Sequence, residues 1–495
     1  MLLAPAFMIL GWSLVFLSGL MVLPLLFALL VSQIFVATSF FMSAIITVFL
    51  GGGLVFATRS ETASLGRRET FLTATLIWVI VPLFAALPLY LSDAIPSATN
   101  AYFEALSGFT TNGASIIENL NDQAPSVLLW RSLIQWVGGF MLIVFVSLLA
   151  SAFNIPGNNP LTRAIAKSTR RRLSRRIRFA VLSILKIYAL LTAVCIVALW
   201  AVGMPAFEAI CYAFSTISTG GFTTSNDTGS IFGSRSVEIV LMIFMVIGAL
   251  NFSLHWSFFN GDRKAYFKDP EYRYLLLAIV LGSFAVFWLM MAETNMGIID
   301  TVRYAIFNTV SAITTTGYNL PLVSNTGQYY WPIGALFLIL FLITVGGSTG
   351  STAGGIKLMR VFVLFKLSGA EIKRLSFPSG VFSLLYGGRR LSREQIMSAW
   401  TFFVIYCFAL VLVTLLLAFN GLDFQSSLSL AVTNLANAGS AAQPLITDVQ
   451  IGTENFVSYN QLPNASKWIL CITMLVGRLE FFAVLSLFNP ALWRR

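Results

Sequence analysis

The chain has 495 residues, of which 57% are hydrophobic and only 10% are charged, whereas about a quarter of the residues in soluble domains carry a charge. This composition excludes a soluble globular protein and predicts one that crosses a membrane many times. The net charge of +11 comes from basic residues grouped between apolar spans, an arrangement that argues against nucleic-acid binding and for contact with membrane lipids.

The apolar residues gather into runs of about 20, the length that crosses a bilayer as a helix. Ten such spans are expected, near residues 5–31, 34–57, 70–92, 127–152, 179–202, 236–259, 274–292, 331–365 (interrupted), 397–420 and 467–488. The first span has no basic residue ahead of it and no small-residue cleavage site. We therefore expect it to remain in the membrane as a helix.

Four short polar strips, each containing a glycine, interrupt the apolar sequence. They are Thr110-Thr111-Asn112-Gly113, Ser218-Thr219-Gly220-Gly221, Thr314-Thr315-Thr316-Gly317 and Ala436-Asn437-Ala438-Gly439. Each follows a short helix-like segment, at 102–107, 209–217, 305–313 and 428–435, and a small hydroxyl residue stands six positions before each final glycine: Ser107, Ser215, Ser311 and Thr433. The glycines are roughly 100–120 residues apart, enough for two crossings and a re-entrant segment. The pattern predicts four repeats of helix, pore helix, filter strand and helix.

A ring of backbone carbonyl oxygens can replace the hydration shell of a cation that enters the membrane. Glycine permits an inward-pointing carbonyl, and the C-terminal ends of short helices would aim partial negative charge at the axis. The predicted potassium-binding filter consists of Thr111, Asn112, Gly113, Thr219, Gly220, Gly221, Thr315, Thr316, Gly317, Asn437, Ala438 and Gly439. The alternative is four polar turns whose glycines serve helix packing. Recurrence at matching places in all four repeats favours the filter.

The basic residues form four groups between the spans. They are Arg59 with Arg67 and Arg68, a stretch from Arg163 to Arg178, a group from Arg263 to Arg273, and a group from Lys373 to Arg393. With ten crossings all four groups fall on one side, and the positive-inside rule makes that side cytoplasmic, together with both termini. The strips then face the exterior. The stretch from Arg163 to Arg178 is read as a topology determinant that contacts lipid headgroups, or alternatively as a docking surface for a cytoplasmic partner.

The interrupted span contains a run of small residues that cannot form a stable helix in isolation. The run is Gly346, Gly347, Ser348, Thr349, Gly350, Ser351, Thr352, Ala353, Gly354 and Gly355. Unwound backbone at membrane depth is tolerated only inside protein or beside a water-filled cavity, so we expect this loop to lie below the filter and act as a gate. A passive kink is the alternative, and a nucleotide-binding loop is disfavoured because no glycine directly precedes Lys357.

Arg478 lies near the middle of the last span. An arginine at membrane depth is costly unless it faces water or a partner, so it indicates a functional position. We expect an electrostatic barrier to cations in the pore. A structural pair with Glu480 is the alternative, although residues two apart on a helix do not face each other.

The strips, their phasing with the spans and the glycine-rich loop resemble the TrkH-type potassium uptake subunits of the Trk/Ktr/HKT cation transporter superfamily over essentially the whole chain. The resemblance implies an all-α polytopic membrane protein with four pseudo-symmetric membrane helix–pore loop–membrane helix repeats around one central pore, preceded by two extra transmembrane helices. The expected boundaries are 1–58 for the extra helices and 59–160, 161–262, 263–372 and 373–495 for the repeats, with the gate loop at 346–355 in the third.

In that family one glycine per repeat forms a short potassium filter, which implies this role for Gly113, Gly221, Gly317 and Gly439. A glycine instead of a serine at the first position implies a preference for potassium over sodium. The resemblance also implies uptake across the bacterial inner membrane, a homodimer, a cytoplasmic ring of TrkA-type nucleotide-binding subunits, and therefore no cofactor in this chain. It places the gate loop in the third repeat and Arg478 in the pore beneath the filter.

Three alternatives remain. The fourth strip with the next residue, Asn437-Ala438-Gly439-Ser440, departs from the family pattern, which leaves open a sodium-conducting or mixed-cation member of the superfamily. A membrane-embedded enzyme is disfavoured by a single histidine and four scattered cysteines without metal-ligand spacing. An inverted-repeat secondary transporter is disfavoured because the repeats are parallel.

Overall fold

The computed structural model of the chain describes residues 4–58, 67–152, 173–226, 234–294, 296–320, 331–378, 380, 384–386, 389–442 and 458–479. Within these residues the regular structure is helical apart from one short antiparallel pair, β1 (Leu385–Tyr386) and β2 (Arg389–Arg390). The prediction of an all-α protein is therefore confirmed.

Seven helices of the described chain are long and apolar enough to cross a membrane. They are α1 (Ala4–Leu30), α2 (Ile34–Thr58), α3 continuing into α4 (Arg67–Ala85, Leu87–Leu91), α6 (Pro125–Ala152), α8 (Leu173–Ala201), α14 (Pro270–Glu293) and α18 (Arg393–Phe419). Several keep large apolar side chains exposed, such as Phe56 on α2, Trp288 on α14 and Phe408 on α18, as expected of surfaces that face lipid. The chain is a multi-span membrane protein.

Four shorter helices carry the strips at their C-terminal ends. They are α5 (Ala98–Phe109), α9 (Ala206–Ile217), α15 (Ile298–Ile313) and α19 (Phe424–Leu435). Each begins several residues before the predicted segment, and α19 is the one among them whose N-cap side chain makes a capping hydrogen bond. At α19 the Asp423 carboxylate accepts a hydrogen bond from the amide of Ser426 at 3.0 Å, which satisfies a free donor of the first turn.

One expected crossing is wrong in detail, because the span near 236–259 is not a single helix. It consists of α11 (Arg235–Ala249) and α12 (Phe252–Phe259), which meet at an angle of 98°. The glycine-rich loop causes the break: the amide of Ser348 donates to the carbonyl of Ala249 at 3.0 Å, and the amide of Phe252 donates to the carbonyl of Gly350 at 3.1 Å. The loop thus takes the hydrogen-bonding positions that a continuous helix would fill itself.

The predicted interruption of the span near 331–365 is confirmed. Helix α16 (Ile333–Val345) ends at Gly346, which has a φ of 71°, and α17 (Leu358–Ser376) starts after Lys357, which has a φ of 82°. With 13 residues, α16 is too short to cross alone. Of the last expected span, near 467–488, the structure describes α21 (Asn464–Arg478), and residues 480–488 lie outside the described residues.

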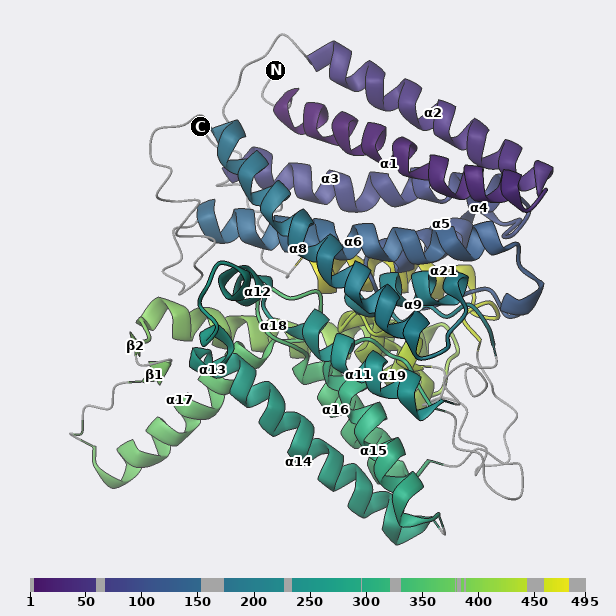
Figure 1. The fold of residues 1–495 in the computed structure, drawn as a ribbon. Coiled ribbons are helices and arrows are strands. Elements are labelled where there is room, and N and C mark those ends of the chain that lie inside the picture. Colours follow the sequence, from purple (N-terminus) through teal and green to yellow (C-terminus); the bar gives the residue numbers. More distant parts are fainter. Residues whose placement is uncertain are drawn as a thin grey trace.

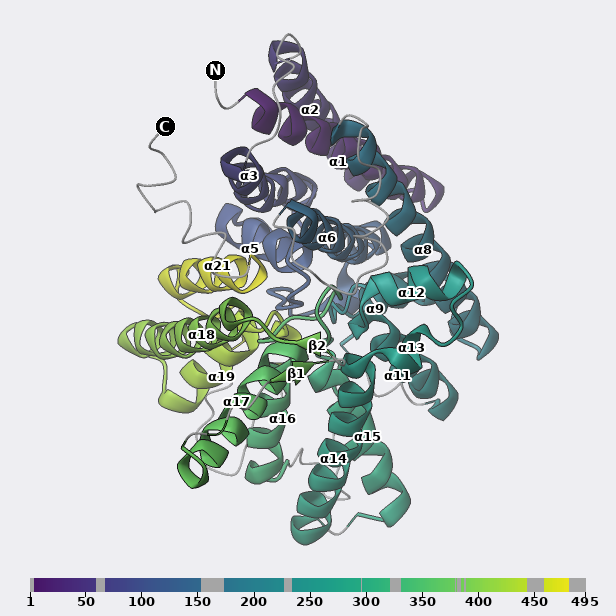
Figure 2. The ribbon, with the colours of Figure 1, turned by 90° about the vertical axis from the view of Figure 1, so that its left-hand side faces the viewer.

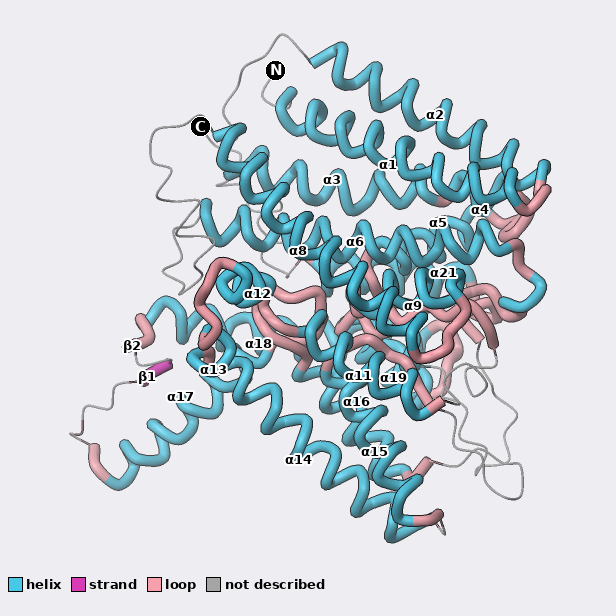
Figure 3. Tube along the Cα trace, viewed as in Figure 1, coloured by secondary structure: helices cyan, strands magenta, loops and turns pink. Residues whose placement is uncertain are grey.

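The helices form four units around a common centre (Figure 2). Each unit reaches the short helix of the next: α6 contacts α9, α11 contacts α15, α16 contacts α19, and α21 contacts α5. The cycle therefore closes. Helix α1 lies outside it against α3 and α6, and α2 packs on α1 and α4 (Figures 1 and 2). Figure 3 shows loop segments crossing the middle of the molecule between the helices.

The remaining elements are the turns η1 (Leu120–Asp122) and η2 (Gly439–Ala441) and the short helix α13 (Ala265–Lys268). The exact repeat boundaries stay a prediction, since 59–66 and 153–172 lie outside the described residues.

Helices α1 and α2 approach closely at a pair of glycines. A β-carbon built on Gly51 would lie 2.9 Å from the carbonyl oxygen of Gly11, and one built on Gly11 would lie 2.7 Å from that of Gly51. A side chain at either position would force the helices apart, as at other small-residue crossings in membranes.

We predict that Gly51→Val lowers the free energy of unfolding by about 1–3 kcal/mol, the usual effect of overpacking a tight interface. Gly52→Val is the matched control, because nothing lies within 4 Å of a β-carbon on Gly52. Thermal unfolding of the two purified proteins in the same detergent makes the comparison. Equal stability would contradict the close crossing.

Candidate functional site

The four short helices end in the same backbone turn. The second residue of each strip is left-handed, with φ of 52° at Thr111, 52° at Thr219, 54° at Thr315 and 52° at Asn437. The following amide then reaches back to a carbonyl within the helix, the ending known as the Schellman motif. These bonds run from Asn112 to Ser107 (2.8 Å), Gly220 to Ser215 (2.8 Å), Thr316 to Ser311 (3.0 Å) and Ala438 to Thr433 (2.7 Å). The small hydroxyl residues six positions before each glycine are therefore the backbone acceptors of this motif.

A left-handed conformation is uncommon for threonine, whose branched β-carbon clashes there. The conformation costs about 1–2 kcal/mol per residue relative to the right-handed one, and glycine usually takes this position. Three of the four repeats nevertheless have threonine, and all four residues are buried. Strain of this kind persists only where surrounding contacts hold it, and it often marks a functional site.

The strips lie against one another in sequence order and close a ring. A β-carbon added to any of the four glycines would collide with the next strip or the residue after it. The distances are 2.1 Å from Gly113 to the Gly220 oxygen, 2.1 Å from Gly221 to the Thr316 oxygen, 2.0 Å from Gly317 to Ser440 Oγ, and 2.4 Å from Gly439 to Asn112 Nδ2. The structure therefore brings together the residues that the sequence predicted as a filter, and their close approach requires glycine.

The backbone carbonyls of the ring fall into two classes. The carbonyl of the third residue of each strip has a protein donor: Asn112 O accepts from Ser440 N (3.3 Å), Gly220 O from Gln135 Nε2 (2.8 Å), Thr316 O from Ser440 Oγ (3.2 Å), and Ala438 O from Ala441 N (3.0 Å). The carbonyls of Thr111, Thr219, Thr315 and Asn437 accept no hydrogen bond from any described residue. Buried carbonyls almost always have a partner, whether protein, water or ion. Four equivalent carbonyls without a protein donor therefore mark a place that suits a cation.

The side chains of these four residues point to a second layer, made by the glycine-rich loop and α21. Their partners are Arg478 Nη2 for Thr111 Oγ1, Thr352 Oγ1 for Thr219 Oγ1 (3.2 Å), Gly354 N for Thr315 Oγ1 (2.6 Å), and Met474 O for Asn437 Nδ2 (3.1 Å). The predicted gate loop and Arg478 thus lie directly against the ring. The contacts also explain why threonine is retained at a strained position, since glycine would have no hydroxyl to offer.

The loop is anchored on its other side by the second and third repeats. The Thr352 hydroxyl donates to the carbonyl of Gly248 at 2.9 Å, and the amide of Thr349 donates to the carboxylate of Glu271 at 2.7 Å. The ends of the loop meet, because a β-carbon on Gly346 would lie 2.2 Å from the carbonyl oxygen of Gly354. The loop therefore leaves the span and returns to nearly the same point, and hydrogen bonds to neighbouring segments hold it in place.

Arg478 joins the two layers. Besides Thr111, its Nη2 donates to the carbonyl of Thr352 at 2.9 Å, and the residue is only 3% exposed. No carboxylate of the described residues lies within ion-pair distance of it, and Glu480 lies outside those residues. Among the described residues, the positive charge is therefore met by hydroxyl and carbonyl dipoles and by no carboxylate.

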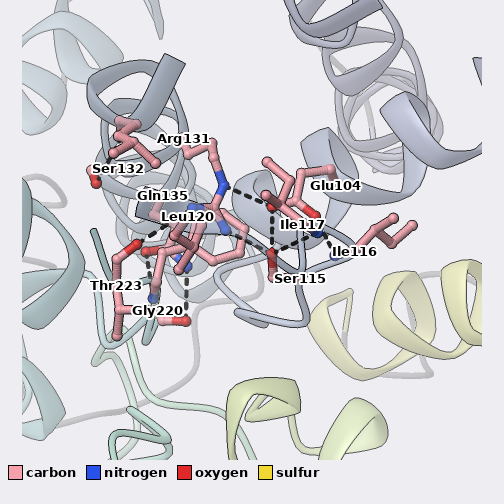
Figure 4. A network of polar contacts seen from close by, with 12 residues as sticks. Glu104, Ser115, Ile116, Ile117, Leu120, Arg131, Ser132, Gln135, Gly220 and Thr223 are labelled. Atoms are coloured by element: carbon pink, nitrogen blue, oxygen red, sulfur yellow. Dashed lines mark hydrogen bonds and ion pairs between the residues drawn. The ribbon is translucent and has the colours of Figure 1, made fainter. Parts of the chain in front are cut away.

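The segments that follow the first and second strips are fastened by a buried ion pair (Figure 4). Arg131 on α6 donates to the Glu104 carboxylate of α5 at 2.7 Å, with side chains 2% and 0% exposed. Glu104 also accepts from the amide of Ile116 at 2.7 Å and from the hydroxyl of Ser115 at 3.0 Å. The Arg131 guanidinium lies 4.2 Å from the ring centre of Phe222, which follows the second strip. The pair therefore ties two strips to two helices.

Several residues that support the ring were missed by sequence reasoning. Gln135 donates to Gly220 O and accepts from the Phe222 amide at 3.3 Å, and Asn112 Nδ2 donates to Asn434 Oδ1 at 2.8 Å. A buried polar residue inside an apolar span, as Gln135 is, is a usable signal for such a role. Asn434 carries no comparable signal, because it lies in a short helix beside an already polar strip.

Glycines on three long helices were also missed. A β-carbon on Gly138 would lie 1.9 Å from the carbonyl oxygen of Phe109, and one on Gly477 2.2 Å from that of Leu435. At Gly248 the corresponding distance to Ile217 is 2.9 Å. Each of these carbonyl groups belongs to the last residue of a short helix, so the glycines allow the ends of the short helices to pack closely against the neighbouring helices. Their distances from the strips along the chain differ, and no fixed spacing reveals them.

The chain matches the sequence model of the TrkH family, described as "Cation transport protein", over residues 36–495. It is 33% identical over 493 residues to the Trk system potassium uptake protein TrkH of Salmonella typhimurium, covering 98% of each chain. It is also 33% identical to the protein of the same name from Halomonas elongata, again over 98% of each. Its structure is similar to the crystal structure of the potassium transporter TrkH from Vibrio parahaemolyticus, with a TM-score of 0.88, 31% sequence identity and coverage of 100% of both chains.

We predict that Glu104→Gln destabilises the protein by about 3–5 kcal/mol, because it leaves the Arg131 charge buried without its counter-ion. Arg374→Ala is the control: Arg374 pairs with Glu371 at the same distance, 2.7 Å, but on an exposed surface, where such pairs contribute about 0–1 kcal/mol. Thermal unfolding in detergent measures both. A Glu104 variant no less stable than the control would refute a structural role for the pair.

Proposed function

Because this chain belongs to the TrkH family of cation transport proteins, we propose that it takes up potassium across the bacterial inner membrane. The relatives are named potassium uptake proteins, and the similar solved structure is that of a potassium transporter. The observation that carries the mechanism is that the carbonyls of four buried residues, Thr111, Thr219, Thr315 and Asn437, accept no hydrogen bond from the part of the chain that the structure describes.

In this proposal the ring of strips is the selectivity filter. A potassium ion that sheds its water is held by carbonyl dipoles, which supply oxygen ligands without a fixed negative charge. The strips of all four repeats take part, since Gly113, Gly221, Gly317 and Gly439 bring them into contact. The C-terminal ends of α5, α9, α15 and α19 precede the ring directly, so their partial negative charges add to the attraction for a cation.

The glycine-rich loop is proposed as the gate and Arg478 as a charge barrier. Support comes from their contacts with the left-handed residues of the ring: Thr352 with Thr219, Gly354 with Thr315, and Arg478 with Thr111. A loop in this position would obstruct an ion that leaves the filter. Opening requires these hydrogen bonds to break together, because Arg478 also holds the loop through the Thr352 carbonyl.

We infer an orientation with the filter toward the outside and both termini in the cytoplasm, on the strength of the basic groups and the positive-inside rule. The homodimer and a regulatory ring of TrkA-type nucleotide-binding subunits are likewise proposed from the resemblance of the sequence to the family. Most of the basic stretch from Arg163 to Arg178, the expected contact for a cytoplasmic partner or lipid, lies outside the described residues. The ranges 59–160, 161–262, 263–372 and 373–495 are proposed as the four pore repeats, and 1–58 as the two additional transmembrane helices.

The filter is tested by rubidium uptake and potassium-limited growth in a bacterium that lacks its own potassium uptake systems. We expect the wild type to rescue growth, and Gly113→Ser to reduce discrimination against sodium by about tenfold, equivalent to about 1.4 kcal/mol, because the new side chain meets the Gly220 carbonyl. Gly203→Ser is the matched control: it also has positive φ, at 99°, but nothing within 4 Å.

If Gly113→Ser discriminated against sodium as strongly as the wild type does, the first strip would not be part of the filter. If the wild type is inserted in the membrane but does not rescue growth, it is co-expressed with a TrkA-type partner. Rescue would then show that the partner was missing, and continued failure would show that potassium is the wrong substrate.

The gate is tested by deleting residues 347–353. Gly346 and Gly354 already lie side by side, so the chain can be rejoined with little displacement of the flanking helices. We expect rubidium flux in proteoliposomes to rise severalfold in the deletion protein, and to rise in Arg478→Ala as well because a buried positive charge is removed. Monodisperse proteins with unchanged or lower flux would count against the gate and the barrier, respectively.

A further inference from the structure

The fourth strip differs from the other three at its glycine. Gly113, Gly221 and Gly317 have φ values of 78°, 79° and 81°, whereas Gly439 starts the 3-10 turn η2. The carbonyl of Gly439 accepts a hydrogen bond from the hydroxyl of Tyr459 at 2.9 Å. This carbonyl is therefore already occupied by a protein donor.

The turn brings Ser440 into the position that the fourth glycine would have filled. A β-carbon built on Gly317, Gly221 or Gly113 would lie 2.0, 2.3 or 3.0 Å from Ser440 Oγ. These three glycines belong to three different repeats, so the hydroxyl lies among the strips and not at their edge. The turn itself is fixed to the first strip, because Asn112 accepts from the amides of Gly439 at 3.1 Å and Ser440 at 3.3 Å.

The Ser440 hydroxyl uses its proton in a hydrogen bond within the protein, while its oxygen can still act as an acceptor or as a ligand. It donates to the carbonyl of Thr316 at 3.2 Å, and a hydroxyl that donates its one proton keeps two lone pairs as acceptors. At the same level the carbonyls of Gly113 and Gly221 accept no hydrogen bond from any described residue, while that of Gly317 accepts one from Asn319 Nδ2 at 3.1 Å. Ser440 is partly exposed, unlike the buried glycines around it, so the space beside it is accessible.

We propose that Ser440 is a specificity-determining residue, whose hydroxyl oxygen supplies the fourth repeat's cation ligand at the glycine level in place of the Gly439 carbonyl. The inference rests on the proposed function, since it requires that a cation pass through the ring. A hydroxyl is a smaller and more adaptable dipole than an amide carbonyl, and selectivity between potassium and sodium depends on the number and field strength of the ligands. Removing the hydroxyl lowers the number of ligands and weakens the preference for the larger ion.

The test compares Ser440→Ala with Tyr459→Phe. The first removes the proposed ligand; the second removes a hydroxyl from the same network but leaves Ser440 unchanged and frees the Gly439 carbonyl. The readout is the concentration of potassium or sodium that halves rubidium uptake, measured in cells and in proteoliposomes. We expect the sodium-to-potassium ratio of these concentrations to fall about fivefold in Ser440→Ala, the scale of one lost ligand of hydrogen-bond strength, and to stay within twofold of wild type in Tyr459→Phe.

A structural role for Ser440 predicts a different result. Losing its hydrogen bond to Thr316 would change thermal stability or maximal uptake for all ions alike, and leave the ratio unmoved. An unmoved ratio in Ser440→Ala, with wild-type protein active, overturns the inference and leaves the proposed function intact. A shift in Tyr459→Phe but not in Ser440→Ala also overturns it, since the Gly439 carbonyl would then be the ligand. Inactive wild type, inserted and supplied with a TrkA-type partner, overturns the proposed function as well.

Discussion

The structure depends on one constraint, which is that backbone without helical hydrogen bonds must find partners inside the membrane. The chain leaves the helix at four strips and again at the glycine-rich loop. These irregular segments satisfy one another: Ser440 N donates to Asn112 O, and Ser348 N to Ala249 O. Because each irregular segment is unstable without its neighbours, all of them must lie together in the middle of the molecule. The closed cycle of helices around them follows from that requirement.

The partners of the strips come from distant parts of the sequence. The loop belongs to the proposed third repeat but bonds to Thr219 of the second strip, and Arg478 near the C-terminus bonds to Thr111 of the first. Displacing the loop would therefore disturb residues of several repeats at once. In the proposed mechanism this linkage joins the filter and the gate, since the left-handed residues offer their carbonyls to the filter, and two of them, Thr219 and Thr315, bond to the loop through their side chains.

The sequence predicted the short helices, the strips and the interrupted span, because glycine clusters and apolar periodicity are local signals. It did not predict the 98° bend between α11 and α12, because its cause is the loop, about a hundred residues later in the chain. Gln135 and Tyr459 were missed for the same reason: their partners, Gly220 and Gly439, are set by tertiary contact. The features that could not be predicted are therefore the long-range hydrogen bonds, because no local pattern in the sequence encodes them.

At the left-handed positions the conformational strain of threonine and the free energy of its hydrogen bonds to the second layer are of similar size. The conformation costs on the order of 1–2 kcal/mol, while each hydrogen bond to the second layer returns about 0.5–1.5 kcal/mol. The strain remains if the loop moves away, but the bonds of Thr219 and Thr315 are lost. These two bonds together contribute about 1–3 kcal/mol to holding the loop against the ring, in addition to the bonds of the loop to Gly248, Ala249 and Glu271. A shift of about 5.5 kcal/mol reverses a 99:1 equilibrium, and in the proposed mechanism this is the scale of free energy that binding to the proposed regulatory partner would have to supply.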